Sequence, residues 1–163
     1  MTIKFPDGDQ DFRSRLVQTQ TASKTSGSST NAHNYSDTGL SKSISISSGN
    51  VVLVLVSGSV RCDNSGNTGF YEAEGQLRVV RGSTVLKGQT VGFRNSSANG
   101  KNFFSQISFG FIDSPGAGNH TYKLQFGGGG NTFRIYVCDG THYYSASGGF
   151  NPSTDLTLFE IDP

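Results

Sequence analysis

The sequence predicts an all-β domain, built as an antiparallel β-sandwich or a closed barrel, on three observations. Glycine contributes 22 of the 163 residues and only 15% of the chain is charged, a composition that suits turns and strands better than helices. No window of eleven or more residues has the three-to-four apolar spacing of an amphipathic helix. Short segments of alternating apolar and polar residues are separated by Gly, Asn, Pro and Ser clusters. Twelve Phe and six Tyr supply enough bulk for the core of one domain.

The beginning of the chain differs from the rest. Met1–Asp11 contains a Pro-Asp-Gly turn signal and few residues that could pack on their own. We therefore expect an extended N-terminal arm over residues 1–14, with Ile3, Phe5 and Phe12 as its docking residues, ahead of a domain over residues 15–163. No apolar segment of the kind found in secretory signals is visible there, so we expect synthesis in a cytoplasm.

The domain reads as a succession of strands and turns. After a predicted strand over Arg15–Gln20, the segment Thr21–Ser36 is rich in Ser, Thr, Asn and Gly, which favours a loop or a loosely ordered extended segment. Leu40, Ile44 and Ile46 then share one parity with serines on the other, the period of two of a half-buried strand. The remaining predicted strands are Asn50–Arg61, Tyr71–Arg81, Val85–Phe93, Phe103–Ile112, Thr121–Phe126, Thr132–Cys138 and Asp155–Ile161.

One predicted strand breaks the alternation. Val51–Val56 is apolar at every position, although a strand of an antiparallel sandwich normally shows one face to water. The segment Phe103–Phe111 is also rich in large apolar residues. Association between subunits would cover the second face, and so would loops or the N-terminal arm folding over the sheet. The candidate self-association residues are Val52, Val54, Val56, Phe104, Phe109 and Phe111.

No pattern of catalytic, cofactor-binding or metal-ligating residues emerges from the sequence. Gly127–Gly130 lies between two predicted strands and lacks the helix that follows a phosphate-binding loop, so it predicts a hairpin loop. Asp7, Asp9 and Asp11 have the spacing of the first three ligands of a calcium loop, but the glycine and the glutamate that such a loop needs are missing. The three histidines lack zinc-site spacing, and no serine stands in a nucleophile elbow. We expect a protein that is not an enzyme and needs no cofactor.

Partners are limited by charge and hydropathy. The net charge is +1 and the basic residues are scattered, which argues against nucleic acid. The longest apolar run has six residues, far fewer than the roughly twenty of a membrane span. Cys62 and Cys138 fall in different predicted strands, where they could pair or stay reduced.

The segment Thr141–Phe150 is the main candidate for a contact loop. It places aromatic and histidine side chains between glycines, a composition typical of adaptable binding loops. The alternative is that its tyrosines merely continue a strand. The candidate surface-contact residues are His142, Tyr143, Tyr144 and Phe150.

Five blocks of the sequence, taken in order, resemble the jelly-roll domain that is common in virion proteins of tailed bacteriophages. The blocks are Leu16–Thr21, Asp37–Ile46 with the Val-Leu-Val-Leu-Val run after it, Leu77–Leu86, Phe111–Gln125 and Leu156–Ile161. The resemblance covers about residues 15 to 162 and implies a jelly roll like that of tumour necrosis factor, assembled as a homotrimer. A trimer would supply the cover that Val51–Val56 needs.

The resemblance also implies a place in the virion. Only fourteen residues precede the match, whereas many family members carry a long stalk, so a small protein that decorates or cements the capsid is expected, docked through its arm to other virion proteins such as the major capsid protein. The alternative is a receptor-binding head or a tail-fibre or spike component that adheres to host glycans or protein. Either protein would be made in the cytoplasm of the bacterial host.

Overall fold

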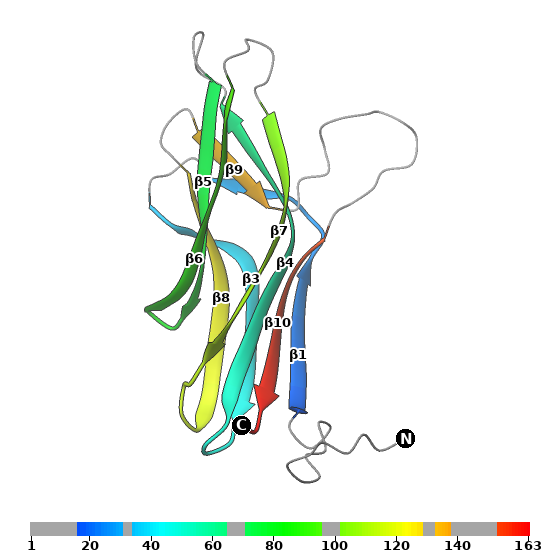
Figure 1. Cartoon of the computed structure of the whole chain (residues 1–163), viewed down its shortest axis with the longest axis vertical. Coiled ribbons are helices and arrows are strands. Elements are labelled where there is room, and N and C mark those ends of the chain that lie inside the picture. The colour runs from blue at the N-terminus through cyan, green and yellow to red at the C-terminus, as the bar shows by residue number, and fades with distance from the viewer. Residues whose placement is uncertain (1–15, 31–33, 65–70, 96–101, 129–132, 138–152) are drawn as a thin grey trace, which may run out of the picture.

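The computed structural model describes residues 16–30, 34–64, 71–95, 102–128, 133–137 and 153–163, without the side chains of 63–64, 71–74, 93–95, 102–104, 128 and 133–134. All regular secondary structure within these ranges is β-strand (Figure 1). The strands are β1 (Leu16–Lys24), β2 (Ser28–Thr30), β3 (Ser36–Ile46), β4 (Val51–Asn64), β5 (Tyr71–Arg81), β6 (Thr84–Asn95), β7 (Asn102–Asp113), β8 (Gly118–Gly128), β9 (Phe133–Val137) and β10 (Thr154–Ile161).

The strands form two antiparallel sheets that face each other (Figure 1). Sheet A has the order β1-β10-β4-β9-β2, with β7 paired to the other edge of β4, and sheet B has the order β3-β8-β5-β6. Four pairs are nested along the chain: β1 with β10, β3 with β8, β4 with β7, and β5 with β6. A ribbon of nested pairs rolled into two sheets is a jelly roll. The predicted antiparallel sandwich is therefore confirmed, and its topology is that of a jelly roll.

The long strand β4 organises sheet A. One of its edges pairs first with β10, over Val51–Gly58, and then with β9, over Val60–Asn64. Its other edge pairs with β7 from Val52 to Asp63. Strand β4 therefore contacts three neighbours, and the orientation of its side chains decides which residues of sheet A are core.

Two local predictions differ from the structure. Gly127–Gly130 is not a hairpin loop, because Gly127 and Gly128 belong to β8, and β8 and β9 lie in different sheets. Thr21–Ser36, expected as a loop or a loosely ordered extended segment, contains regular strand. Strand β1 continues to Lys24, which pairs with Thr154 of β10, and Ser28–Thr30 form the short strand β2 against β9. Both are edge strands, which need a neighbour's backbone hydrogen bonds rather than apolar side chains. Their Ser- and Thr-rich sequences therefore lack the apolar alternation by which a strand is predicted.

The core lies between the two sheets. Its largest fully buried side chains include Tyr122, Ile44 and Leu77. The even-numbered residues of β4 face this core, and Val52, Val54, Val56 and Val60 are 0%, 0%, 1% and 2% exposed.

A polar contact joins the two sheets beside this core. The Tyr122 hydroxyl on β8 donates a 2.7 Å hydrogen bond to Asp113 Oδ2 on β7, and Arg81 Nε on β5 lies 3.1 Å from the same oxygen. Burial raises the pKa of Tyr122 and the hydrogen bond to Asp113 raises it further, so this tyrosine stays a neutral donor. The contact fixes the edge strand β7 of sheet A to sheet B.

Different strand ends and turns lie at the two ends of the sandwich (Figure 1). The start of β1, the end of β10 and the short turns β3–β4 and β7–β8 lie at the lower end. The end of β4, the start of β5, the end of β6 and the start of β7 lie at the upper end. The β5–β6 turn is only Gly82 and Ser83, and Gly82 has a φ of 59°, a conformation that glycine adopts without strain.

Candidate functional site

The structure places three of the candidate self-association residues inside the chain itself. Val52, Val54 and Val56 fill the core between the sheets, so they offer no surface to a second subunit. The expectation that they form an interface is corrected: within Val51–Val56, the odd-numbered residues face away from sheet B. The physical reason is that even positions of β4 lie opposite the buried Leu156 and Leu158 of β10.

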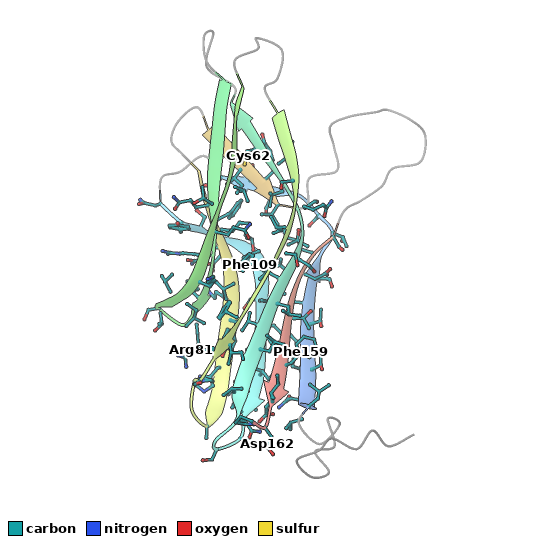
Figure 2. The ribbon with its side chains drawn as sticks, in the orientation of Figure 1. Cys62, Arg81, Phe109, Phe159 and Asp162 are labelled. Atoms are coloured by element: carbon teal, nitrogen blue, oxygen red, sulfur yellow. The ribbon has the colours of Figure 1, made fainter. Side chains whose placement is uncertain are left out.

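The aromatic candidates on β7 also face the core or lie outside the described side chains. Phe109 and Phe111 pair with Val56 and Val54, and both are half-buried and pack against the core cluster. Figure 2 shows Phe109 on β7. The backbone of Phe104 pairs with Arg61, and its side chain is not among those described. Phe109 and Phe111 therefore cover the core at the β7 edge of the sandwich and are not part of its outer surface.

The outer side of sheet A carries a continuous group of apolar side chains, which we call the apolar face. The register aligns Leu16 with Ile161 and Ile161 with Val51 in one row, and Phe159 with Leu53 and Leu53 with Ile112 in the next. Leu16, Leu55 and Ile112 are 50%, 39% and 66% exposed. No other described strand packs on this side of the sheet. The apolar face consists of Leu16, Val51, Leu53, Leu55, Ile112, Phe159 and Ile161.

The apolar face ends where polar residues begin. Thr21, Thr157 and Leu55 form the next row, followed by Ser23, Asp155 and Ser57. At Leu55 the neighbouring position on β7 is Gly110, where a Cβ would lie 2.4 Å from Leu55 Cδ2. The Leu55 side chain thus lies down over the backbone of β7, which keeps this part of the face flat. A flat apolar area with a polar border is typical of protein contact surfaces.

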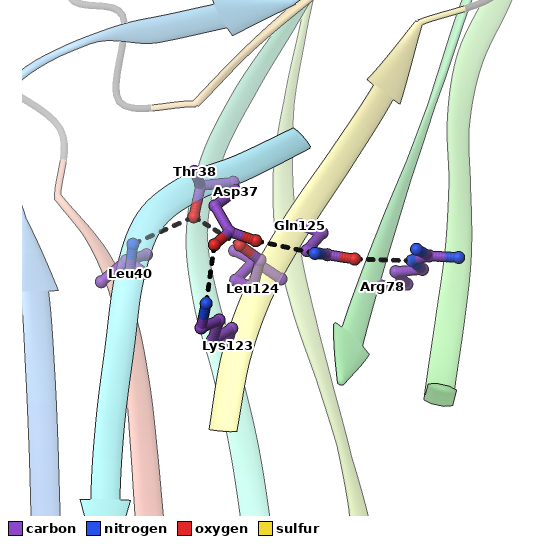
Figure 3. Close-up of polar contacts among 7 residues, drawn as sticks. All are labelled: Asp37, Thr38, Leu40, Arg78, Lys123, Leu124 and Gln125. Atoms are coloured by element: carbon purple, nitrogen blue, oxygen red, sulfur yellow. Dashed lines mark hydrogen bonds and ion pairs between the residues drawn. The ribbon is translucent and has the colours of Figure 1, made fainter. Parts of the chain in front are cut away.

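The outer side of sheet B carries a row of interacting polar side chains (Figure 3). Asp37 on β3 lies opposite Gln125 on β8, which lies opposite Arg78 on β5. Gln125 Nε2 donates to Asp37 Oδ1 at 2.7 Å, and Arg78 Nε donates to Gln125 Oε1 at 2.9 Å. Lys123 Nζ lies 2.9 Å from Asp37 Oδ2. We call Asp37, Gln125 and Arg78 the polar row.

Asp37 is held in its charged form by this row. The hydrogen bond from Gln125 lowers the pKa of Asp37 most, and the contact with Lys123 lowers it further against a smaller effect of burial. The next residue on β3, Thr38, is buried. Its hydroxyl donates to the Leu124 carbonyl at 2.8 Å and accepts from Leu40 N at 3.1 Å. The backbone at the start of β3 is therefore fixed from both sides of the sheet.

Arg78 is fixed by an aromatic ring as well. Its guanidinium carbon lies 3.7 Å from the centroid of the Tyr35 ring, and the Tyr35 hydroxyl donates to Gln76 Oε1 on the strand of Arg78. A second cation–π contact lies on sheet A, where the guanidinium of the buried Arg61 is 3.6 Å from the centroid of Tyr136. These pairs leave no signal in the sequence, because nothing local in it shows which strands are neighbours.

Among the residues that the structure describes, no group of three or more His, Cys, Asp or Glu side chains is placed to hold a metal ion. His120 Nε2 lies 3.1 Å from the Gly116 carbonyl oxygen in the turn before β8. The buried Cys62 thiol lies 3.7 Å from the Val91 carbonyl oxygen, while Cys138 is outside the described ranges. The part of the chain described contains no helix that is long and apolar enough to cross a membrane.

Two groups of predicted contact residues lie outside the described ranges. They are the arm residues Ile3, Phe5 and Phe12, and the loop residues His142, Tyr143, Tyr144 and Phe150. The expected boundary between arm and domain falls next to the first described residue, Leu16, which belongs to the apolar face. Both groups remain predictions.

Comparisons with known proteins find similarity only among solved structures. No family model and no curated protein matches the sequence. A mutant VP2 protein of infectious bursal disease virus, in derived T=1 particles, is similar at a TM-score of 0.38 and 10% identity, over 90% of this chain and 40% of that one. The VP2 subviral particle of the same virus gives 0.37 and 10%, over 90% and 40%. The chain thus spans about two fifths of the length of these proteins.

Proposed function

We propose that this chain is a non-enzymatic structural protein of a bacteriophage virion, which assembles as a homotrimer through the apolar face and decorates the capsid. The observation that carries the proposal is the apolar face itself. Full burial of a Leu, Ile or Phe side chain contributes about 1.5–3 kcal/mol, so covering this face favours association. The sequence blocks that resemble trimeric jelly-roll domains of phage virions supply the number of subunits and the location.

The position of the apolar face suits a closed assembly. It lies on sheet A, so three copies can meet around one axis with every sheet B facing outward. Leu16 and Ile161 place the start of β1 and the end of β10 at one edge of this face (Figure 1). The residues that precede Leu16 therefore leave the domain beside the proposed subunit contact, where an arm can reach neighbouring virion proteins.

The native mass of the purified protein tests the assembly. Three chains of 17.3 kDa give a complex of about 52 kDa, which sedimentation or native mass spectrometry distinguishes from a monomer. Leu55→Asp places a charge in the apolar face and should give a folded monomer. Val85→Asp is the matched control, because Val85 is 52% exposed on the outer side of sheet B and its variant should remain a trimer. A monomeric wild type would refute the trimer, and a trimeric Leu55→Asp variant would refute the apolar face as the subunit contact.

Capsids that lack the protein test its place in the virion. The wild type should co-sediment with them and raise the temperature at which they release DNA, because a ligand of the assembled state stabilises that state. Deletion of Met1–Asp11 should leave the number of chains in the oligomer unchanged and abolish this binding. Oligomers that ignore capsids but bind host cells, and lose that binding when Tyr143 and Tyr144 are changed to Ala, would replace decoration with the receptor-binding alternative.

A further inference from the structure

On the outer side of sheet B, two neighbouring side chains hold Arg78 in a fixed position. Arg78 donates from Nε to Gln125 and stacks on the ring of Tyr35, which together fix the plane of its guanidinium. Among the described residues, none forms a hydrogen bond or an ion pair with its two terminal nitrogens. These nitrogens form the fork that binds the two oxygens of a carboxylate in parallel.

Each side-chain oxygen of the polar row already has a hydrogen-bond or ion-pair partner. The orientation of the Gln125 amide is settled, because arginine only donates and a carboxylate only accepts. Its oxygen is taken by Arg78, and both Asp37 oxygens are taken by Gln125 and Lys123. On the other side of Arg78, the Gln76 oxygen is taken by the Tyr35 hydroxyl, which leaves the Gln76 Nε2 group as a donor. The groups left around Arg78 therefore match an anion.

The surface next to Arg78 is open on the side away from Gln125. Its partner on the edge strand β6 is Gly88, which is exposed and has no side chain. A Cβ there would meet only the Leu77 carbonyl oxygen, at 3.4 Å, and Arg78 Cβ, at 3.9 Å. A ligand can therefore approach the arginine fork over the bare backbone of β6.

We propose that Arg78 is the centre of a binding site for the carboxylate of an acidic saccharide on the outer side of sheet B. Gln76, two residues before Arg78 on β5, and its register partner Thr90 on β6 are exposed and offer an amide and a hydroxyl on the same face of the sheet. These groups match the hydroxyls that surround the carboxylate of a uronic or sialic acid. Because the guanidinium is already fixed, binding loses little side-chain entropy, which favours affinity.

This site goes beyond the proposed function and complements it. Sheet B lies opposite the apolar face, so the site stays exposed in the proposed trimer, which would carry three copies of it. Three weak sites on one particle component bind a multivalent glycan surface far more tightly than one does. That gain rests on the proposed trimer, whereas binding of a single saccharide does not.

Calorimetric titration with a galacturonic acid trisaccharide tests the site. The full-length wild type should bind it at millimolar concentration or below and should not bind its methyl ester. Arg78→Ala should weaken binding at least about tenfold, and Arg78→Lys at least about fivefold, because lysine keeps the charge but lacks the fork. Lys87→Ala is the matched control, since it removes one exposed positive charge from the neighbouring strand β6 and should change the affinity less than about twofold.

Three results would overturn the proposal: no binding by the wild type, an Arg78→Lys variant that binds like the wild type, or equally tight binding of triglutamate, which would make the site a peptide site. The melting temperature of each variant shows whether it is folded. The Leu55→Asp variant should bind the trisaccharide with wild-type affinity per chain, so a failure of the proposed trimer and a failure of this site give different results.

Discussion

The backbone amide of Ser47 donates a 2.7 Å hydrogen bond to the carboxylate of Glu160, a side chain that is only 1% exposed. Gln18 Nε2 and Asn50 Nδ2 donate to the same carboxylate at 2.7 and 2.8 Å. Glu160 therefore joins β1, the β3–β4 turn and β10 at the lower end of the sandwich. Burial alone would raise its pKa, but the hydrogen bonds from Ser47, Gln18 and Asn50 outweigh burial and lower the pKa to about 2.

We expect Glu160→Gln to destabilise the fold by about 2–3 kcal/mol, because an amide supplies one acceptor where the carboxylate supplies two charged oxygens. Chemical unfolding at pH 7 measures the change. A variant as stable as the wild type would show that the three donors find water instead.

Acid should weaken the protein through the same residue. Its folded pKa of about 2 lies below the ordinary value of 4.5, so the stabilisation is complete above pH 4.5 and is lost as the pH falls through 2. The free energy of unfolding should decline over this window in the wild type and decline less in Glu160→Gln. Parallel curves for the two proteins would assign the acid sensitivity to other carboxylates.

The inward orientation of the even residues of β4 predicts unequal effects on stability for two valine-to-alanine substitutions. Val54→Ala leaves a cavity in the core and should cost about 2 kcal/mol, whereas Val85→Ala, at a position 52% exposed, should stay within about 0.5 kcal/mol of the wild type. Thermal unfolding at one protein concentration compares them. Equal losses would contradict the orientation of β4.

Gly58 should not tolerate a side chain. It has a φ of 149°, and a Cβ there would lie 2.6 Å from the Cα of Thr154 on β10. Gly58→Ala should cost about 2 kcal/mol or more, from backbone strain together with a forced separation of β4 and β10. Gly88→Ala on the edge strand β6, where a Cβ meets nothing closer than 3.4 Å, is the control and should be nearly neutral.

Removal of the Tyr122 hydroxyl should loosen the edge strand β7. Tyr122→Phe deletes the 2.7 Å hydrogen bond to Asp113 and should cost about 1–2 kcal/mol. A double-mutant cycle with Asp113→Asn should show a coupling of about 1 kcal/mol between the two residues. Strictly additive effects would mean that the hydroxyl acts independently of Asp113.

Alternation in the sequence was enough to predict the sandwich, since strands such as Tyr71–Arg81 carry apolar residues on one parity and turn residues at their ends. Alternation could not show which side chains of Val51–Val56 face the core, because both parities are apolar. The signal lay further along the same strand: Ser57 and Ser59 continue the odd parity with polar residues, while Val60 and Cys62 continue the even parity with buried ones. Reading all fourteen residues of β4 as one strand would have indicated which face is core.

The polar row could not be predicted in the same way. Asp37, Arg78 and Gln125 are 41 and 47 residues apart along the chain and meet only because β3, β8 and β5 are neighbours in a definite register. Register is decided by the packing of the buried side chains on the opposite face of the sheet. Polar residues on the outer face follow that register and leave no local pattern of their own.

The nesting of the strand pairs has a consequence for how the chain folds. The innermost pair, β5 and β6, is a hairpin closed by two residues, whereas the outermost pair brings Leu16 to Ile161. The entropy lost in closing a loop rises with its length, so pairing that starts at the β5–β6 hairpin and proceeds outward closes each later loop on strands already in place. On this route β1 and β10 join last, and the apolar face, which both strands help to build, is complete only when the whole roll has formed. Partly folded chains would then lack the surface needed to associate, which couples assembly to the completion of folding.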